Sequence, residues 1–207
     1  KYVPILQTKQ NEYAALNELA LNIKPFVKPL FNLTNSEKER RAHALPKQIL
    51  DRWGNLPCYI DLDTSRDFII ENKFYAEWIF DRLELNNVDL VLSLSSSMSM
   101  LTAVSNAIKN YGHNLAIRVA ITELNSDTSE KIDKLISACD LTDSDVDLII
   151  DYAENVQPNS FLHFQSIQLV LNNLTANKNF RNVIVASSSM PKELPRDDYN
   201  PHGFVPR

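Results

Sequence analysis

Glycine is scarce in this sequence, with three glycines among 207 residues. Phosphate-binding loops of nucleotide enzymes need clustered glycines, because their backbone amides must approach the ligand closely. Neither GxGxxG nor GxxxxGK[ST] occurs in the chain. The sequence therefore argues against a Rossmann or P-loop enzyme, and its residues identify no cofactor.

Cysteine and histidine are also few. Cys58 and Cys139 stand in or beside apolar segments, which is typical of buried, reduced thiols. There is no CxxC motif and no Cys/His cluster, so we predict no metal site. The histidines fall outside the predicted strand ends and are expected at the surface, at positions His43, His113, His163 and His202.

The chain has neither an excess of positive charge nor a long apolar run. Acidic residues outnumber basic ones by 26 to 21, which disfavours nucleic acid or an anionic membrane as a partner. No apolar run approaches the ~20 residues that span a bilayer. The N-terminus has no charged-then-apolar signal segment. These absences predict a cytoplasmic globular protein with no membrane partner.

Short β-branched runs alternate with longer segments of helical spacing. Apolar strands separated by helices predict a parallel sheet covered by helices. Seven units at intervals of roughly 25 to 30 residues favour a (β/α)8 barrel of the TIM type. We expect strands at 2–6, 26–33, 58–62, 88–94, 115–121, 146–152 and 182–186, and helices at 12–21, 36–53, 72–85, 98–109, 129–139 and 161–172.

A closed barrel needs an eighth strand, which the sequence does not show. We assign residues 1–190 to a barrel domain of about seven β/α units. Residues 191–207, rich in proline and charge, are expected to form an irregular tail that leads to a missing C-terminal region. The barrel is then truncated before its last unit; the alternative is an open architecture.

The first unit carries a recognisable pattern. Residues 2–9 read YVPILQTK, residues 12–16 read EYAAL, and residues 29–33 read PLFNL. This resembles the "beta protein" family of bacteriophages and bacterial genomes, whose members open with YVPILKxKxGEfxAL followed by PLxEI. The chain departs from that pattern at Gln7, Asn11 and Asn32. The resemblance implies a longer protein in a phage or mobile-element setting, with a phage or host protein as partner in phage–host conflict. It implies no reaction.

Polar side chains at strand ends are the candidate site, because parallel α/β folds bind ligands there. Arg118 lies inside an apolar run, and a buried guanidinium must be paired. It is either an anion clamp, assisted by Lys9, or a structural ion-pair partner of Asp61 or Asp151. The two aspartates, each after an apolar triplet, are the candidate catalytic residues; the alternative is that they cap loops or pair with arginine.

Serine clusters follow two of the predicted strands. The tetrad SSSM occurs at 95–98 and again at 187–190. Hydroxyls and amides at a helix start bind anions without glycine, so Ser96 and Ser188 are candidate ligand-binding residues; the alternative is simple helix capping. No GxSxG elbow marks a serine nucleophile.

Two functions remain open from the residues. The first is a non-catalytic module that binds a phage or host protein through its loops. The second is a hydrolase-type enzyme that acts on an anionic or phosphorylated small molecule at the carboxyl ends of the strands. Fold class does not choose between them.

Overall fold

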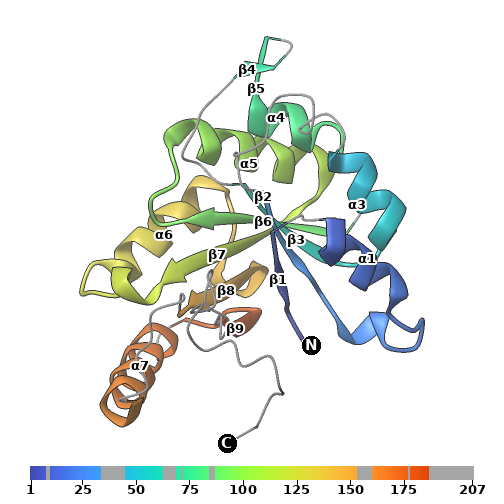
Figure 1. Ribbon diagram of the computed structural model, residues 1–207. Helices are drawn as coiled ribbons and strands as arrows, with labels where there is room; N and C mark the ends of the chain where they lie inside the picture. The colour runs from blue at the N-terminus through green and yellow to red at the C-terminus, as the bar shows by residue number, and fades with distance from the viewer. Residues whose placement is uncertain are drawn as a thin grey trace, which may run out of the picture.

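Seven parallel strands form the centre of the structure, a computed structural model that describes residues 1–7, 10–33, 45–62, 69–70, 72–83, 87–152, 160–176 and 178–186. The strands pair in chain order, so each predicted strand lies beside the next one (Figure 1). They are β1 (Ile5–Leu6), β2 (Leu30–Leu33), β3 (Cys58–Leu62), β6 (Val88–Ser93), β7 (Asn114–Ala120), β8 (Val146–Asp151) and β9 (Asn182–Ala186).

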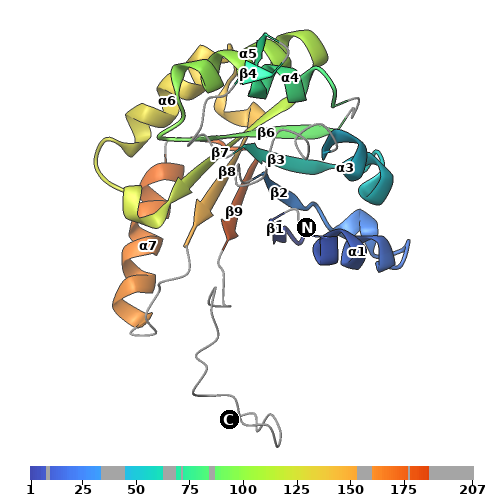
Figure 2. The same cartoon turned by 45° about the horizontal axis from the view of Figure 1, so that its top comes forward.

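Helices cover the outer face of this sheet. Figure 2 shows the sheet curled, with the helices gathered outside it. They are α1 (Gln10–Glu18), α3 (Leu45–Trp53), α4 (Tyr75–Phe80), α5 (Met98–Tyr111), α6 (Thr128–Ala138) and α7 (Ser160–Thr175). The α/β architecture predicted from the alternation is therefore present.

Side chains alternate between the two faces of each strand, as a pleated strand requires. Ile60, Leu90 and Ile117 are fully buried on the outer side, in the core that the helices complete. The side chains between them in sequence point to the concave inner side. Their apolar members form a second, smaller buried cluster of Leu30, Tyr59, Val91, Ala116, Ile149 and Ala186.

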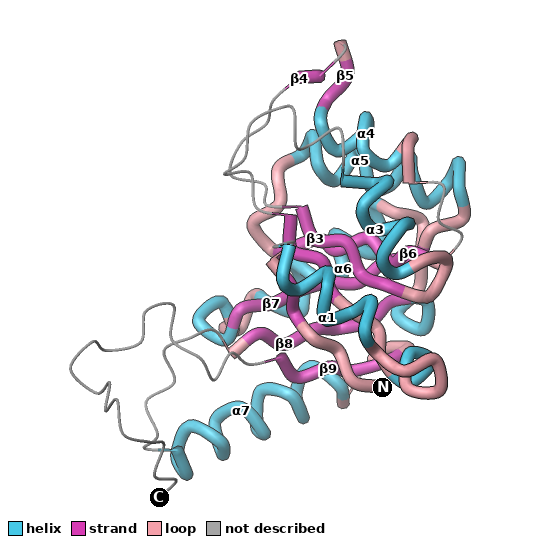
Figure 3. The backbone as a smooth tube through the Cα atoms, turned by 45° about the vertical axis from the view of Figure 1, so that its right-hand side comes forward, coloured by secondary structure: helices cyan, strands magenta, loops and turns pink. Residues whose placement is uncertain are grey.

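Strands β1 and β9 are the two edges of the sheet. In the part of the chain that the structure describes, β1 pairs with β2 alone and β9 with β8 alone. Figure 3 shows the strands side by side from β3 to β9, with α7 along the β9 side. The described strands thus form an open, curled half-barrel.

One hairpin is absent from the sequence prediction. Strands β4 (Ile69–Ile70) and β5 (Lys73–Phe74) pair antiparallel and project from the body (Figure 1). Asn72 in their turn has φ +63°, a left-handed conformation that asparagine adopts more readily than most residues. The helix expected at 72–85 is therefore shorter and is limited to α4.

Two further differences concern the boundaries of predicted elements. A short 3-10 helix, Lys24–Phe26, occupies the start of the expected strand 26–33, so β2 begins at Leu30. The helix expected at 36–53 is seen as α3, and residues 36–44 lie outside the described ranges.

His113, expected at the surface, is 5% exposed, because it precedes β7 directly and packs against Tyr111. Cys58 and Cys139 are free and buried, as predicted.

None of the helices in the described ranges combines the length and apolarity that crossing a bilayer requires.

Candidate functional site at the carboxyl ends of the strands

Arg118 occupies the inner face of β7, near the carboxyl end of the strand. Its neighbours Ile117 and Val119 are fully buried in the outer core, so the alternation of the strand directs Arg118 the other way, into the concave side. Asp61 on β3 and Asp151 on β8 are directed inward by the same alternation. Three strands thus deliver one cation and two carboxylates to one end of the sheet.

The guanidinium of Arg118 contacts both aspartates, which is the pairing that the sequence offered as the structural alternative. Nη1 donates to Asp61 Oδ2. Nη2 donates to Asp151 Oδ2 at 2.5 Å, and Nε donates to the same oxygen at 3.0 Å. We call these three residues the Arg118 triad.

The Arg118 triad is only slightly open to solvent. The side chains of Arg118, Asp61 and Asp151 are 21%, 13% and 13% exposed. Burial works to lower the pKa of Arg118, but the charges and hydrogen bonds of the two aspartates outweigh it and raise that pKa. Arg118 therefore stays charged, and the triad is held by charge-assisted hydrogen bonds, which are the strong class.

The serine cluster lies beside the triad. Ser93, the last residue of β6, is the register partner of Arg118. Its backbone N–H donates to Ser96 Oγ at 2.9 Å, and its own hydroxyl lies 3.2 Å from the hydroxyls of Ser95 and Ser96. Ser97, rather than Ser96, caps α5 by accepting from the Met100 amide at 3.2 Å. Ser96 thus closes the turn that leads into the helix.

Two of the predicted site residues, Lys9 and Ser188, lie outside the described residues. Asn32, which replaces the acidic residue of the family pattern, is the register partner of Asp61 on β2. It therefore faces the same inner side as the triad.

A second polar cluster lies at the opposite, amino-terminal ends of the strands. Lys28 Nζ is 2.6 Å from Asp89 Oδ2 and 3.5 Å from Asp147 Oδ2. Arg181 Nε donates to Asp147 Oδ1 at 2.8 Å, and Arg181 Nη2 donates to Asp89. The hydroxyl of Tyr59 donates to Asp147 Oδ2 at 2.6 Å. We call these five residues the lower cluster.

The lower cluster is balanced in charge, and its two aspartates are buried while Arg181 is partly exposed. Burial works to raise the pKa of Asp147, but hydrogen bonds from Arg181, Tyr59 and Asn182 hold it well below its usual range. Burial and the hydrogen bond to Asp147 raise the pKa of Tyr59 far above its ordinary value. Asp147 is therefore a carboxylate and Tyr59 a neutral donor across the physiological range.

Sequence reasoning missed the lower cluster, although a signal was present. Asp89 and Asp147 each stand second in their strand and are followed by three apolar residues, a pattern similar to the one that singles out Arg118. Parallel α/β folds bind ligands at the carboxyl ends of strands, so these aspartates at the amino ends were not among the predicted site residues. A charged residue inside any apolar run, at either end, predicts a buried partner.

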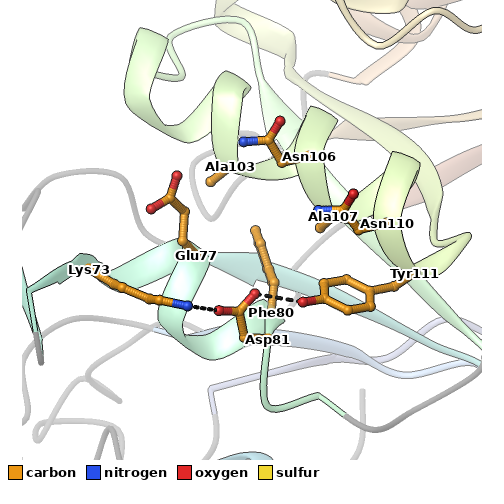
Figure 4. A pocket seen from close by; sticks show the side chains of 9 residues that line it. All are labelled: Lys73, Glu77, Phe80, Asp81, Ala103, Asn106, Ala107, Asn110 and Tyr111. Carbon is orange, nitrogen blue, oxygen red and sulfur yellow. Dashed lines mark hydrogen bonds and ion pairs between the residues drawn. The ribbon is translucent and has the colours of Figure 1, made fainter.

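A groove of about 170 Å³ lies on the outer side, between α4 and α5. Figure 4 shows its wall, where Lys73 reaches Asp81 at 2.5 Å and the Tyr111 hydroxyl donates to Asp81 at 2.8 Å. Asn106 and Asn110 line the side formed by α5. The groove belongs to the helical layer and contains no member of the Arg118 triad.

Within the described ranges, no three acidic, histidine or cysteine side chains gather as metal ligands. The triad offers two carboxylates, but both are bound to the same guanidinium.

Comparison with known proteins gives one family. The sequence model of the family described as Beta protein matches residues 2–206. A search of curated proteins found no match.

Proposed function

The chain belongs to the Beta protein family, and we propose that it is a non-catalytic binding module. In this proposal the recognition surface is the carboxyl end of the curled sheet, centred on the Arg118 triad. The partner is a phage or host protein, in line with the phage and mobile-element setting that the family resemblance implies.

The pairing of Arg118 with both aspartates is the observation that carries this proposal. Both carboxylates that a hydrolase would use as base or ligand are engaged by one guanidinium. A carboxylate held in a charge-assisted pair is a weak base, because accepting a proton costs it that pair. The arrangement suits a preformed polar recognition patch better than acid–base chemistry.

The experiment compares capture by three versions of the protein. The three versions are wild type, Arg118→Lys and the control Arg52→Lys, which changes an exposed residue of α3. Each is used to capture partners from cells that carry the phage or mobile element. A partner enriched by wild type and by the control is then purified and titrated. We expect Arg118→Lys to bind it at least ~10-fold more weakly, because an ammonium cannot reproduce the planar fork. Equal dissociation constants for all three proteins would reject the triad as the recognition patch.

A second candidate is an enzyme acting on an anionic or phosphorylated small molecule, with Asp61 or Asp151 as catalytic residue and Arg118, Lys9, Ser96 and Ser188 as ligand-binding residues. The observation that favours it is the register of Ser93 with Arg118, which sets hydroxyl groups beside a guanidinium. Turnover of phosphate esters that is lost in Asp61→Asn or Asp151→Asn, and kept in Asp143→Asn in the 3-10 helix that precedes β8, would favour the enzyme over the module.

We also propose that the half-barrel is the larger part of a (β/α)8 barrel. Seven parallel strands in chain order, with helices outside and inner side chains in layers, support this. One further β/α unit between β9 and β1 would close it.

A further inference from the structure

Strands β3 and β8 are connected to each other at both ends, although they are not neighbours. Two other strands, β6 and β7, separate them in the sheet. At the carboxyl end, Arg118 joins Asp61 of β3 to Asp151 of β8. At the amino end, the Tyr59 hydroxyl of β3 reaches Asp147 of β8 at 2.6 Å. The curl of the sheet brings both pairs together across the concave side.

The amino-end contact is the better fixed of the two. Tyr59 is 2% exposed and Asp147 is fully buried. Arg181 and Asn182 each donate to Asp147 Oδ1 at 2.8 Å, which leaves Oδ2 directed to Tyr59 and Lys28. The carboxylate that receives the Tyr59 hydroxyl is therefore held from several sides.

The carboxyl-end contact depends on the distance between the same two strands. Neighbouring strands lie about 4.8 Å apart, so Arg118 must reach across β6 to touch Asp61. It can do so while also holding Asp151 only if the sheet is curled enough to bring β3 toward β8. A shift of about 1 Å would take a hydrogen bond of 2.5 to 3.0 Å out of its favourable range.

Between the two contacts lies a buried apolar layer that can transmit a change of strand position. Tyr59 and Asp61 are two residues apart on the same face of β3, about 6.6 Å. The side chains of Val91, Ala116 and Ile149 fill the space between the polar layers. Close-packed interiors have discrete arrangements and resist gradual deformation, so a change of strand separation at one end is felt at the other.

We infer that Tyr59 and Asp147 are positioning residues, whose hydrogen bond sets the separation of β3 and β8 at which Arg118 holds both Asp61 and Asp151. The importance of that geometry for recognition rests on the proposed function. The geometric coupling itself does not, and it is tested without any partner.

The test observes the Nε–H group of Arg118 by NMR in the ligand-free protein. In wild type this proton is donated to Asp151. Tyr59→Phe removes the hydroxyl and keeps the ring in the apolar layer. We expect the Arg118 Nε–H signal to move toward that of free arginine and its hydrogen exchange to accelerate roughly 10-fold or more.

Two controls separate positioning from a general loss of stability. Tyr111→Phe removes another tyrosine–aspartate hydrogen bond, of 2.8 Å, on the outer side. Val104→Ala weakens the fully buried outer core at a position on α5, outside β3 and β8. Both should leave the Arg118 signal and its exchange rate unchanged. An unchanged Arg118 signal in Tyr59→Phe, or an equal change in the controls, would overturn the inference.

If Tyr59→Phe does not fold, Arg118→Lys tests the same coupling from the other end, because coupling between two sites is reciprocal. The ring signals of Tyr59 should then shift, and unchanged ring signals would overturn the inference. A partner that binds wild type and Arg118→Lys equally rejects the proposed function, while the response of Arg118 to Tyr59→Phe still decides the positioning role.

Discussion

Arg118 is a long cationic side chain inside an apolar strand, and its environment explains why the chain tolerates it. The ion pairs of its guanidinium with the two aspartates offset the free energy of removing its charge from water. Removing Arg118 therefore does more than delete a contact, because it leaves two partly buried carboxylates facing each other.

Replacing Arg118 with alanine should destabilise the protein. A fully buried pair broken on one side costs about 3–5 kcal/mol, and the 21% exposure of Arg118 reduces this to about 2–4 kcal/mol. Urea unfolding at pH 7 measures the loss, and Arg52→Ala on the exposed side of α3 should change stability by less than about 0.5 kcal/mol. A wild-type midpoint for Arg118→Ala would show that the triad contributes nothing to folding.

His113 gives a second prediction at the scale of one residue. It is 5% exposed, and neither ring nitrogen has a hydrogen-bond partner among the described residues. Burial lowers the pKa of His113, so the folded protein resists a proton that the unfolded chain accepts near pH 6.5. The contribution of His113 to stability is unaffected above that pH and falls as pH decreases below it, by up to about 1.4 kcal/mol per pH unit.

Unfolding curves at pH 7.5 and 5.5 for wild type and His113→Phe measure this contribution. The variant should lose less stability than wild type between the two pH values, because it has no imidazole to protonate. Parallel losses in the two proteins would contradict the prediction.

The sequence was informative at this scale where a charge interrupts an apolar run. Arg118 and its two aspartates stand out because each interrupts or directly follows a run of apolar residues. His113 was misplaced because a single histidine beside a glycine gives no sign of what packs over it. The packing over His113 includes the Tyr111 ring, whose centroid lies 5.8 Å from that of the imidazole. Gly112, which stands between the two residues, has a left-handed φ of +69°.

At the scale of elements, strands were predicted better than the ends of helices. All seven strands of the sheet follow from apolar runs, because a strand covered on both faces is apolar throughout. The β4–β5 hairpin was missed because its strands have two residues each, too few to show alternation. The start of α5 at Met98 agrees with the helix expected at 98–109, whereas its end at Tyr111 lies two residues later.

The cap of α5 can be tested directly. Ser97→Ala should reduce the free energy of unfolding by about 1 kcal/mol, because the Met100 amide loses its acceptor. Ser99→Ala, two residues on and exposed within the helix, should be neutral or slightly stabilising, since alanine has the higher helix propensity. Equal effects of the two changes in thermal unfolding would argue that Ser97 is not the energetically important cap.

At the scale of the whole molecule, the polar layers at the two ends of the sheet join two sets of strands that have β3 and β8 in common. The lower cluster joins side chains next to or within β2, β3, β6, β8 and β9. The Arg118 triad joins β3, β7 and β8. Together they hold the curl from inside, while the helices hold it from outside. The sequence predicts that a charge inside an apolar strand has a partner, but which strands face one another across the curl follows only from the structure.

The edges of the half-barrel give the last prediction. On β9, Val183 and Val185 are 43% and 58% exposed, and an apolar edge strand is a site of aggregation. In the 207-residue chain, Val185→Lys should therefore raise solubility and change the unfolding midpoint little. In a chain that continues beyond Arg207 and supplies the proposed closing unit, Val185 would be covered, and the same change would cost about 1–3 kcal/mol. The longer chain should also unfold at a higher temperature than the shorter one. If Val185→Lys has the same effect in both chains and their midpoints agree, the additional residues do not cover β9 and the proposed closure is wrong.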